Sequence, residues 1–148
     1  MKGGDKMKRY HIGYTTGVFD MFHIGHLNIL RNAKNMCDFL IVGVSTDELV
    51  QQYKGRTPII RFNERLEIVK AIRYVDQAVP QLTMDKMDAW HQLRFDALFH
   101  GSDWKGSDMY NKIVDDFEKV GVDVVFLPHT SGVSSTLLSD VLHHLKEE

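Results

Sequence analysis

The stretch that decides the fold is Gly17-Val18-Phe19-Asp20-Met21-Phe22-His23-Ile24-Gly25-His26. It lies between an apolar run that predicts a buried strand over Ile12–Thr16 and a helical pattern over residues 27–36. A helix start presents unpaired backbone N–H groups and a partial positive charge, which together favour an anion such as phosphate. Histidines three positions apart, as His23 and His26 are, can share one helix face and contact a phosphoryl group together. The stretch therefore predicts phosphate chemistry where a strand gives way to a helix.

A histidine pair can also have a structural or a metal-binding role. A histidine near an apolar face is often only a satisfied structural residue, and His-x-x-His is half of a zinc ligand pattern. Cys37 is the chain's one cysteine and lies a full helix away, and the sequence has no further Cys/His cluster with ligand spacing. We therefore expect no metal site built from side chains, and the position between strand and helix favours a catalytic pair.

Length and composition are those of an ordinary globular protein. With 148 residues we expect one domain over 1–148, with residues 1–8 as a disordered lead. The formal net charge of −2 is too small to indicate a nucleic-acid-binding or membrane-binding surface. No apolar run approaches the roughly 20 residues that span a bilayer, and the first residues lack a signal-peptide pattern. Together with the single cysteine, these features make the cytoplasm the expected compartment.

Strand-like and helix-like segments alternate along the rest of the chain. Apolar runs predict strands over 39–44, 77–80, 97–101 and 122–127. Helical spacing predicts helices over 27–37, from 45–48 onward, over 66–72, 87–93, 109–120 and 133–145. Asn63 is the predicted N-cap of the third of these helices, and the polar stretch Gln51–Pro58 is a predicted loop. Strands separated by helices indicate an α/β fold with right-handed crossovers and a parallel sheet of about five strands.

The unusual polar residues of the chain gather in three loops, each after a predicted strand. These loops are 17–26, 101–107 and 128–136. Ligands of parallel sheets bind beyond the carboxyl ends of the strands, near the point where the strand order reverses. We therefore expect the three loops to converge on one pocket.

Several further motifs accompany the opening stretch. In chain order they are Ser45-Thr46-Asp47-Glu48, Asn63-Glu64-Arg65, Ile72-Arg73-Tyr74-Val75-Asp76, Gly101-Ser102-Asp103-Trp104 and His129-Thr130-Ser131-Gly132-Val133-Ser134-Ser135-Thr136. Together they resemble the signatures of the HxGH nucleotidyltransferases, and among these the cytidylyltransferase family, over almost the whole chain. The resemblance implies a Rossmann-like, three-layer α/β sandwich that forms a homodimer. It also implies transfer of CMP from CTP to a small phosphorylated alcohol, most closely glycerol 3-phosphate, with Mg²⁺ as cofactor and pyrophosphate as the second product.

The resemblance assigns roles to individual residues. His23 and His26 would contact the nucleotide phosphates and stabilise the transition state, and Lys54 would neutralise the two reacting phosphates. Lys86 would contact the acceptor. The remaining nucleotide-binding positions would be Val18, Phe19, Asp20, Gly25, Arg56, Gly101, Asp103, Trp104, His129, Thr130, Gly132, Ser134, Ser135 and Thr136.

Several of these residues also have a structural interpretation. The alternatives are a local turn or cap for Asp20, a solvated charge for Arg56, ordinary core for Trp104, and a helix cap for Ser134 or Ser135. For Arg65 and Arg73, which also match family positions, the structural alternative is an ion pair that supports the fold, and we prefer it for Arg65. These interpretations do not exclude a functional role at the same position.

The chain departs from the family pattern at three positions. His129 stands where the family has Arg, which replaces a permanent bidentate donor by one whose charge depends on pH. Ser131 replaces a Glu and Ser102 an Asp. Two other functions therefore stay open: an adenylyl-transferring relative of the heptose-phosphate or FAD-forming type, and a catalytically silent nucleotide-binding module.

Overall fold

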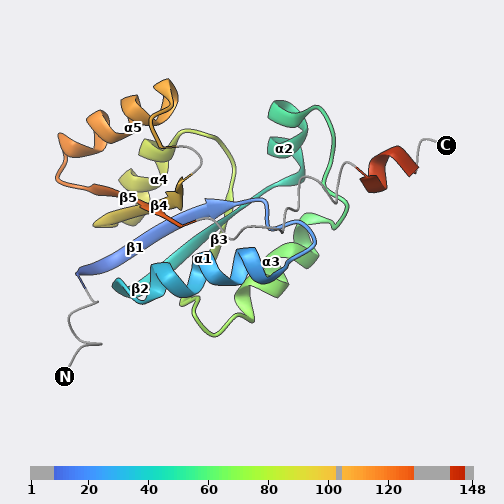
Figure 1. The fold of residues 1–148 in the computed structure, drawn as a ribbon, viewed down its shortest axis with the longest axis horizontal. Coiled ribbons are helices and arrows are strands. Elements are labelled where there is room, and N and C mark those ends of the chain that lie inside the picture. Colours follow the sequence, from blue (N-terminus) through green and yellow to red (C-terminus); the bar gives the residue numbers. More distant parts are fainter. Residues whose placement is uncertain (1–8, 103–104, 129–140, 146–148) are drawn as a thin grey trace.

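The computed structural model describes residues 9–102, 105–128 and 141–145 (Figure 1). Within these ranges a five-stranded, all-parallel sheet has the strand order β3-β2-β1-β4-β5. The strands are β1 (Tyr10–Gly17), β2 (Cys37–Ser45), β3 (Gln77–Gln81), β4 (Ala97–Gly101) and β5 (Asp123–Leu127). The predicted α/β class with a parallel sheet of about five strands is confirmed.

Helices cover both faces of this sheet. They are α1 (Ile24–Lys34), α2 (Asp47–Lys54), α3 (Phe62–Lys70), α4 (Lys86–Leu93) and α5 (Asp108–Glu118). Helices α1 and α3 lie on one face, α4 and α5 on the other, and α2 stands beyond the carboxyl end of β2 (Figure 1). The result is the Rossmann-like, three-layer arrangement that the family resemblance implied.

The core is divided by the sheet into two apolar clusters. Successive side chains of a strand point to opposite faces, so Leu40 and Val42 of β2 pack toward α1 and α3, while Ile41 packs toward α4. In the second cluster the ring of Tyr14 stacks on Phe95 with ring centroids 4.8 Å apart. The strands are thus buried on both faces, as the continuous apolar runs predicted.

Two predicted boundaries around β2 were wrong. The first helix does not continue to Cys37, because Met36 accepts backbone hydrogen bonds from residues 9 and 10 and Cys37 already pairs with Tyr10 in the sheet. The predicted loop Gln51–Pro58 is helical up to Lys54. Thr46 caps this helix at its start, and Gly55 ends it with a left-handed φ of 77°, which glycine adopts without strain.

Two further predictions failed at helix ends. Asn63 lies inside α3, and the N-cap is Arg61, whose side chain makes no capping hydrogen bond. The carboxylate of Asp47 on α2 accepts the backbone N–H of Phe62 (3.2 Å) instead, a long-range partner that local sequence cannot reveal. Helix α5 ends at Glu118, before Val120, because the N–H of Val122 turns back to the carbonyl of Phe117.

The topology places the carboxyl ends of β1, β4 and β5 side by side. The strand order reverses between β1 and β4, and the loops after these strands leave from the same edge of the sheet (Figure 1). Residues 1–8, 103–104 and 129–140 lie outside the described residues, so convergence of all three loops on one pocket stays a prediction. So does the first part of the closing helix, of which residues 141–145 are described and helical. In the described ranges, no helix is long and apolar enough to cross a membrane.

Candidate active site

The two histidines of the opening stretch cap α1 with their own rings. His23 is the N-cap residue, and its Nδ1 accepts the backbone N–H of Gly25 at 3.0 Å. The Nδ1 of His26 accepts the backbone N–H of His23 at 3.2 Å. The rings stack with centroids 4.0 Å apart. The pair forms a reciprocal capping box in which imidazoles replace the usual Ser/Thr and Glu/Gln side chains.

This capping geometry fixes the tautomer of each ring. Because both Nδ1 atoms accept hydrogen bonds, a neutral ring must carry its proton on Nε2. Burial, with a smaller contribution from the charge of His23, lowers the pKa of His26 to about 3. In the structure as it stands His26 is therefore neutral at physiological pH. It offers an Nε2–H donor rather than a positive charge.

Asp20 orders the loop that precedes these histidines. The side chain is 5% exposed, and its carboxylate accepts the backbone N–H groups of Ile59 (2.8 Å) and Ile60 (2.9 Å). The loop residues Phe19 and Met21 on either side have left-handed φ values of 55° and 51°, which are uncommon for residues with a Cβ. Asp20 thus ties a tightly turned loop to the segment between α2 and α3.

Arg65 of α3 is the centre of a second set of bonds to the same loop. It is 1% exposed, and its guanidinium donates to the carbonyls of Val18 (2.7 Å), Ser45 (2.8 Å) and Ile60 (2.8 Å). It also pairs with Asp47 at 2.7 Å, so the ion pair expected for this residue is present. One buried side chain therefore joins the carboxyl ends of β1 and β2 to α2 and α3. The sequence alone did not reveal these hydrogen bonds to the backbone carbonyls.

Lys54, the last residue of α2, interacts electrostatically with Asp20 and with Arg56. Burial and the charge of Arg56 lower the pKa of Lys54, and the charge of Asp20 opposes this shift. The charges of Asp20 and Arg56 therefore both act on the amine of Lys54, in opposite directions. In the C-terminal part of the chain, Nε2 of His143 lies 3.1 Å from the carbonyl oxygen of Thr57, so residues 141–145 contact the segment that carries these cations. The structure thus places Lys54 and Arg56, which we call the basic segment, near the loop that contains Asp20.

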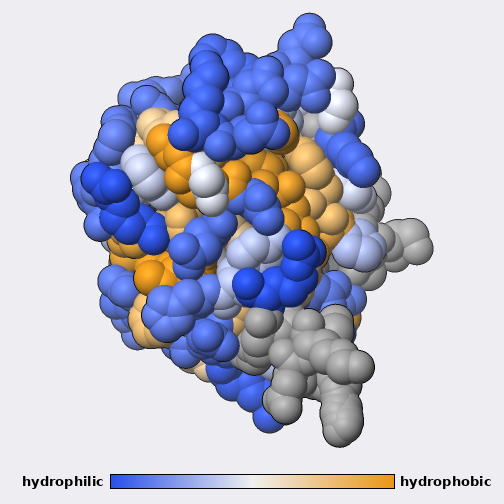
Figure 2. Space-filling view, turned by 90° about the vertical axis from the view of Figure 1, so that its left-hand side faces the viewer, coloured by the Kyte–Doolittle hydropathy of each residue, from blue (hydrophilic) through white to orange (hydrophobic). Residues whose placement is uncertain are grey.

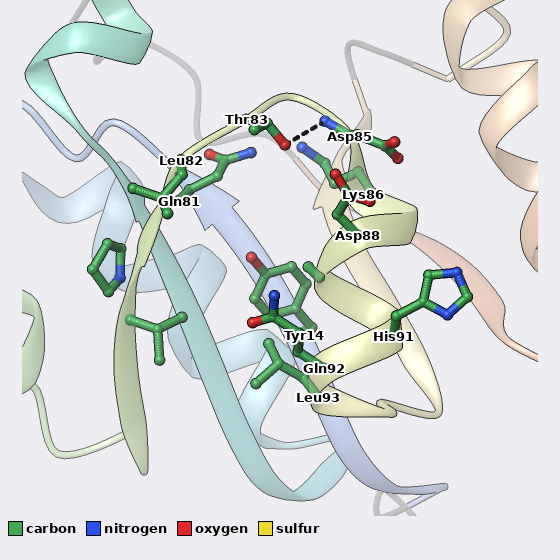
Figure 3. A pocket seen from close by; sticks show the side chains of 13 residues that line it. Tyr14, Gln81, Leu82, Thr83, Asp85, Lys86, Asp88, His91, Gln92 and Leu93 are labelled. Atoms are coloured by element: carbon green, nitrogen blue, oxygen red, sulfur yellow. Dashed lines mark hydrogen bonds between the residues drawn. The ribbon is translucent and has the colours of Figure 1, made fainter.

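Lys86 lies apart from this group, at the first turn of α4. It is 5% exposed, and burial lowers its pKa to about 8. It lines a cavity of about 450 Å³ between β3 and α4, together with Tyr14, Gln81 and Thr83 (Figure 3). The sequence singled out Lys86 but missed Tyr14. The sequence carried no signal that distinguishes Tyr14, because Thr15 and Thr16, which follow it in β1, also bear hydroxyl groups.

The remaining predicted site residues are only partly described. Val18 contributes its carbonyl to Arg65, the buried Phe19 ring lies 5.4 Å from the ring of His26, Gly25 is the second residue of α1, and Gly101 ends β4. Asp103, Trp104, His129, Thr130, Gly132, Ser134, Ser135 and Thr136 lie outside the described residues. Their roles stay predictions.

The described residues also bear on metal binding. Among them, no three His, Cys, Asp or Glu side chains lie together as a metal-ion cage. Mg²⁺ does not require one, because it commonly keeps several waters and binds substrate phosphates with one or two carboxylates. The Mg²⁺ cofactor therefore stays a prediction.

A family model for cytidylyltransferase-like proteins matches residues 14–140, most of the chain. The chain belongs to the cytidylyltransferase-like family. It is therefore a nucleotidyltransferase. A glycerol-3-phosphate cytidylyltransferase of Bacillus subtilis (strain 168) is 35% identical over 133 residues, covering 85% of this chain and 92% of that protein. An FAD synthase of Pyrococcus horikoshii is 34% identical and covers 98% of this chain and 97% of its own length.

A solved structure supports the same assignment. The lipopolysaccharide core biosynthesis protein from Thermoplasma volcanium GSS1 matches this nucleotidyltransferase with a TM-score of 0.69 and 27% identity. The match covers 82% of this chain and 97% of that one. The family match over residues 14–140 contains the two histidines, Asp20 and Arg65.

Proposed function

We propose that this nucleotidyltransferase transfers CMP from CTP to a small phosphorylated alcohol, with glycerol 3-phosphate as the first acceptor to test. A phosphate oxygen of the acceptor forms a bond to the α-phosphorus, the bond from that phosphorus to the bridging oxygen breaks, and pyrophosphate leaves. No covalent enzyme intermediate is involved. The 35% identity to the Bacillus subtilis enzyme supports this choice of nucleotide and acceptor.

One observation carries the mechanism: the histidine pair caps α1 through Nδ1 and keeps its protons on Nε2. Hydrogen-bond donors held in this way can meet the negative charge that builds on the bridging oxygen as pyrophosphate departs. Their positions are set by backbone bonds before substrate binds, so no reorganisation is required during the reaction. His23 and His26 are therefore the proposed catalytic residues.

The basic segment would bind the reacting phosphates. Lys54 would neutralise the charge of the two phosphates that approach each other, and Arg56 would contact CTP. Mg²⁺, bound to the triphosphate, would supply further charge neutralisation. Lys86 would contact the acceptor, because its amine is a buried cation at the carboxyl edge of the sheet. The loops that follow β4 and β5 would contribute the remaining nucleotide contacts predicted from the sequence.

The proposed function is tested by pyrophosphate release over a grid of nucleotides and acceptors. We expect turnover with CTP and glycerol 3-phosphate, and little with CTP when the acceptor lacks a phosphate. Turnover with ATP but not CTP would overturn the choice of nucleotide. Tight CTP binding without turnover for any acceptor would instead support the silent nucleotide-binding module.

A second candidate is adenylyl transfer. The FAD synthase of Pyrococcus horikoshii matches almost the whole chain at 34% identity, nearly the same identity as the cytidylyltransferase. An adenylyltransferase would use the same histidine pair, so the difference between the two functions lies in the recognition of the base. The ATP arm of the grid decides between them.

We also propose that the protein is a homodimer. Figure 2 shows apolar surface gathered in a band on the face at the amino ends of the strands, bordered by hydrophilic side chains. Apolar patches with polar rims are typical of protein–protein interfaces. Light scattering after size-exclusion chromatography should give twice the monomer mass, and the monomer mass at all concentrations tested would overturn the proposal.

A further inference from the structure

The cavity between β3 and α4 contains two buried polar groups that the fold does not use. Tyr14 is 2% exposed and Lys86 is 5% exposed, and both line the cavity. Among the described residues, neither the Tyr14 hydroxyl nor the Lys86 amine has a hydrogen-bond or ion-pair partner. Burial alone raises the pKa of Tyr14 to about 12. Figure 3 shows the hydroxyl pointing toward the part of the cavity where Lys86 and Gln81 lie.

The Tyr14 hydroxyl opens into the cavity and bonds no other described residue. If Tyr14 served only to fill the core, phenylalanine would stack on Phe95 equally well. The neighbouring strand also accommodates the hydroxyl, because a Cβ at Gly43 would lie only 2.4 Å from it. The absence of a side chain at Gly43 thus makes room for the Tyr14 hydroxyl, which has no hydrogen-bond partner among the described residues. This is the expected arrangement of a group that binds a ligand.

The other lining groups indicate the chemistry of that ligand. Ser45 donates to Oε1 of Gln81 (2.8 Å), which leaves the amide nitrogen of Gln81 as a donor directed toward Lys86 (Figure 3). The carboxylates of Asp85 and Asp88 line the α4 side and act as acceptors. A purely anionic ligand would face these carboxylates, whereas hydroxyl groups can both donate to them and accept from Tyr14 and Gln81. The lining therefore favours a polyol attached to a phosphate.

The size of the cavity admits polyols longer than glycerol. A volume of about 450 Å³ lies in the usual range for small-molecule sites. It has room for about 15 water molecules at roughly 30 Å³ each, far more than a three-carbon alcohol would displace. The lining also includes the apolar side chains of Val79, Ala89 and Leu93, and Gln92 lies beside Leu93 (Figure 3). The carbon chain of a longer polyol would contact these lining side chains.

We infer that the acceptor is a phosphorylated polyol longer than glycerol, whose hydroxyls lie between β3 and α4, and that Tyr14 determines this specificity. The inference rests on the proposed function, because it concerns the acceptor of the same reaction. Lys86 binds near the phosphate end, and the hydroxyl of Tyr14 binds an oxygen further along the chain. The order of preference is ribitol 5-phosphate, then erythritol 4-phosphate, then glycerol 3-phosphate.

The test compares Tyr14→Phe with wild type, using CTP and acceptors of increasing length. For ribitol 5-phosphate we expect KM to rise about tenfold, the usual effect of one lost hydrogen bond, with KM for CTP unchanged. n-Pentyl phosphate has the same length without hydroxyls, and its KM should be insensitive to the change. Tyr10→Phe is the matched control, because Tyr10 is the first residue of β1 and its hydroxyl donates to Asp123 (2.8 Å), away from the cavity. Gly43→Ala, which crowds the hydroxyl, should reproduce the loss.

Stability separates binding from folding in this test. Tyr14→Phe removes a buried group without a described partner, so its urea midpoint should equal or exceed that of wild type. Equal KM values for ribitol 5-phosphate in Tyr14→Phe and wild type, or a clear preference for glycerol 3-phosphate, would overturn the inference and leave the proposed function standing. If no acceptor gives turnover, calorimetric binding of ribitol 5-phosphate decides. Binding weakened by Tyr14→Phe supports the inference, and absent or unchanged binding overturns it.

Discussion

His23 and His26 hold the start of α1 with the same rings that we propose for catalysis. Stability and activity are therefore linked at these two positions, and a substitution must separate them. Glutamine is the usual residue at the third position of a capping box, so His26→Gln keeps an acceptor for the N–H of His23. Alanine keeps neither the acceptor nor the Nε2–H donor.

The first prediction concerns this pair of variants. His26→Gln should lose about a hundredfold or more in kcat and less than about 1 kcal/mol in unfolding free energy. His26→Ala should show the same loss of kcat and an additional loss of about 1 kcal/mol from the missing cap. Steady-state kinetics and urea unfolding measure both quantities. Wild-type kcat in His26→Gln would show that the ring is a helix cap only.

The second prediction concerns pH. The pKa of His26 is about 3 in the folded protein and 6.5 is its ordinary value, so the unfolded state takes up this proton first as the pH falls. Unfolding free energy should therefore decrease below pH 6.5, by about 2 kcal/mol from this residue between pH 7.5 and pH 5. The measurement is urea unfolding of wild type and His26→Gln at both pH values. Parallel losses in the two proteins would contradict the assigned shift.

Arg65 gives the third prediction at the residue scale. A lysine ammonium cannot reproduce the planar fork that contacts Val18, Ser45 and Asp47, so Arg65→Lys should cost about 2–4 kcal/mol of unfolding free energy. The exposed Arg73 is the matched control, and Arg73→Lys should change stability by less than about 0.5 kcal/mol. Equal urea midpoints for the two variants would contradict the role of Arg65 as a buried connection.

At the scale of elements, the end of α2 positions the basic segment. Gly55 has a φ of 77°, and an added Cβ there would contact nothing within 4 Å, so Gly55→Ala strains the backbone without a clash. We expect a cost of about 1 kcal/mol and a several-fold loss of kcat, because Lys54 and Arg56 flank this residue. Gly121→Ala imposes the same strain at φ 79° after α5 and is the control.

The control should lose similar stability and keep wild-type kcat. Thermal unfolding and initial rates on the two variants provide the comparison. Equal kcat in Gly55→Ala and Gly121→Ala would show that the orientation of the basic segment does not matter for turnover.

Element types could be predicted from this sequence more reliably than element ends. The alternation of apolar runs and helical spacing identified each strand of the sheet, because strands buried on both faces must be apolar throughout. The end of α1 and the start of α3 were misplaced because distant residues decide them. Tyr10 pairs with Cys37, and Asp47 takes over the capping that was assigned to Asn63. Such partners are adjacent only in the folded chain.

For the whole molecule, the motif that carries phosphate chemistry was identified from the sequence, but most of the bonds that hold it in place were not. The type and spacing of His23 and His26 indicate their chemistry, and the family resemblance assigned a role to Lys54. The ion pair of Arg65 was predicted, but its bonds to the carbonyls of Val18 and Ser45 were not, and Tyr14 was assigned no role, because these features depend on burial, which a single sequence does not record. Arg65 connects two strand ends, and Tyr14 places a hydroxyl inside a cavity whose other wall is α4. Three-dimensional packing, rather than local pattern, determines the contacts of these two residues.

The central claim is that the chain transfers a nucleotidyl group by attack at the α-phosphorus of CTP. The most direct measurement incubates the protein with glycerol 3-phosphate or ribitol 5-phosphate and CTP that carries ³²P at either the α or the γ position. We predict that α label appears in the CDP-alcohol and that γ label appears only in pyrophosphate. Label from the γ position in the acceptor, or in inorganic phosphate without CDP-alcohol, would contradict the claim.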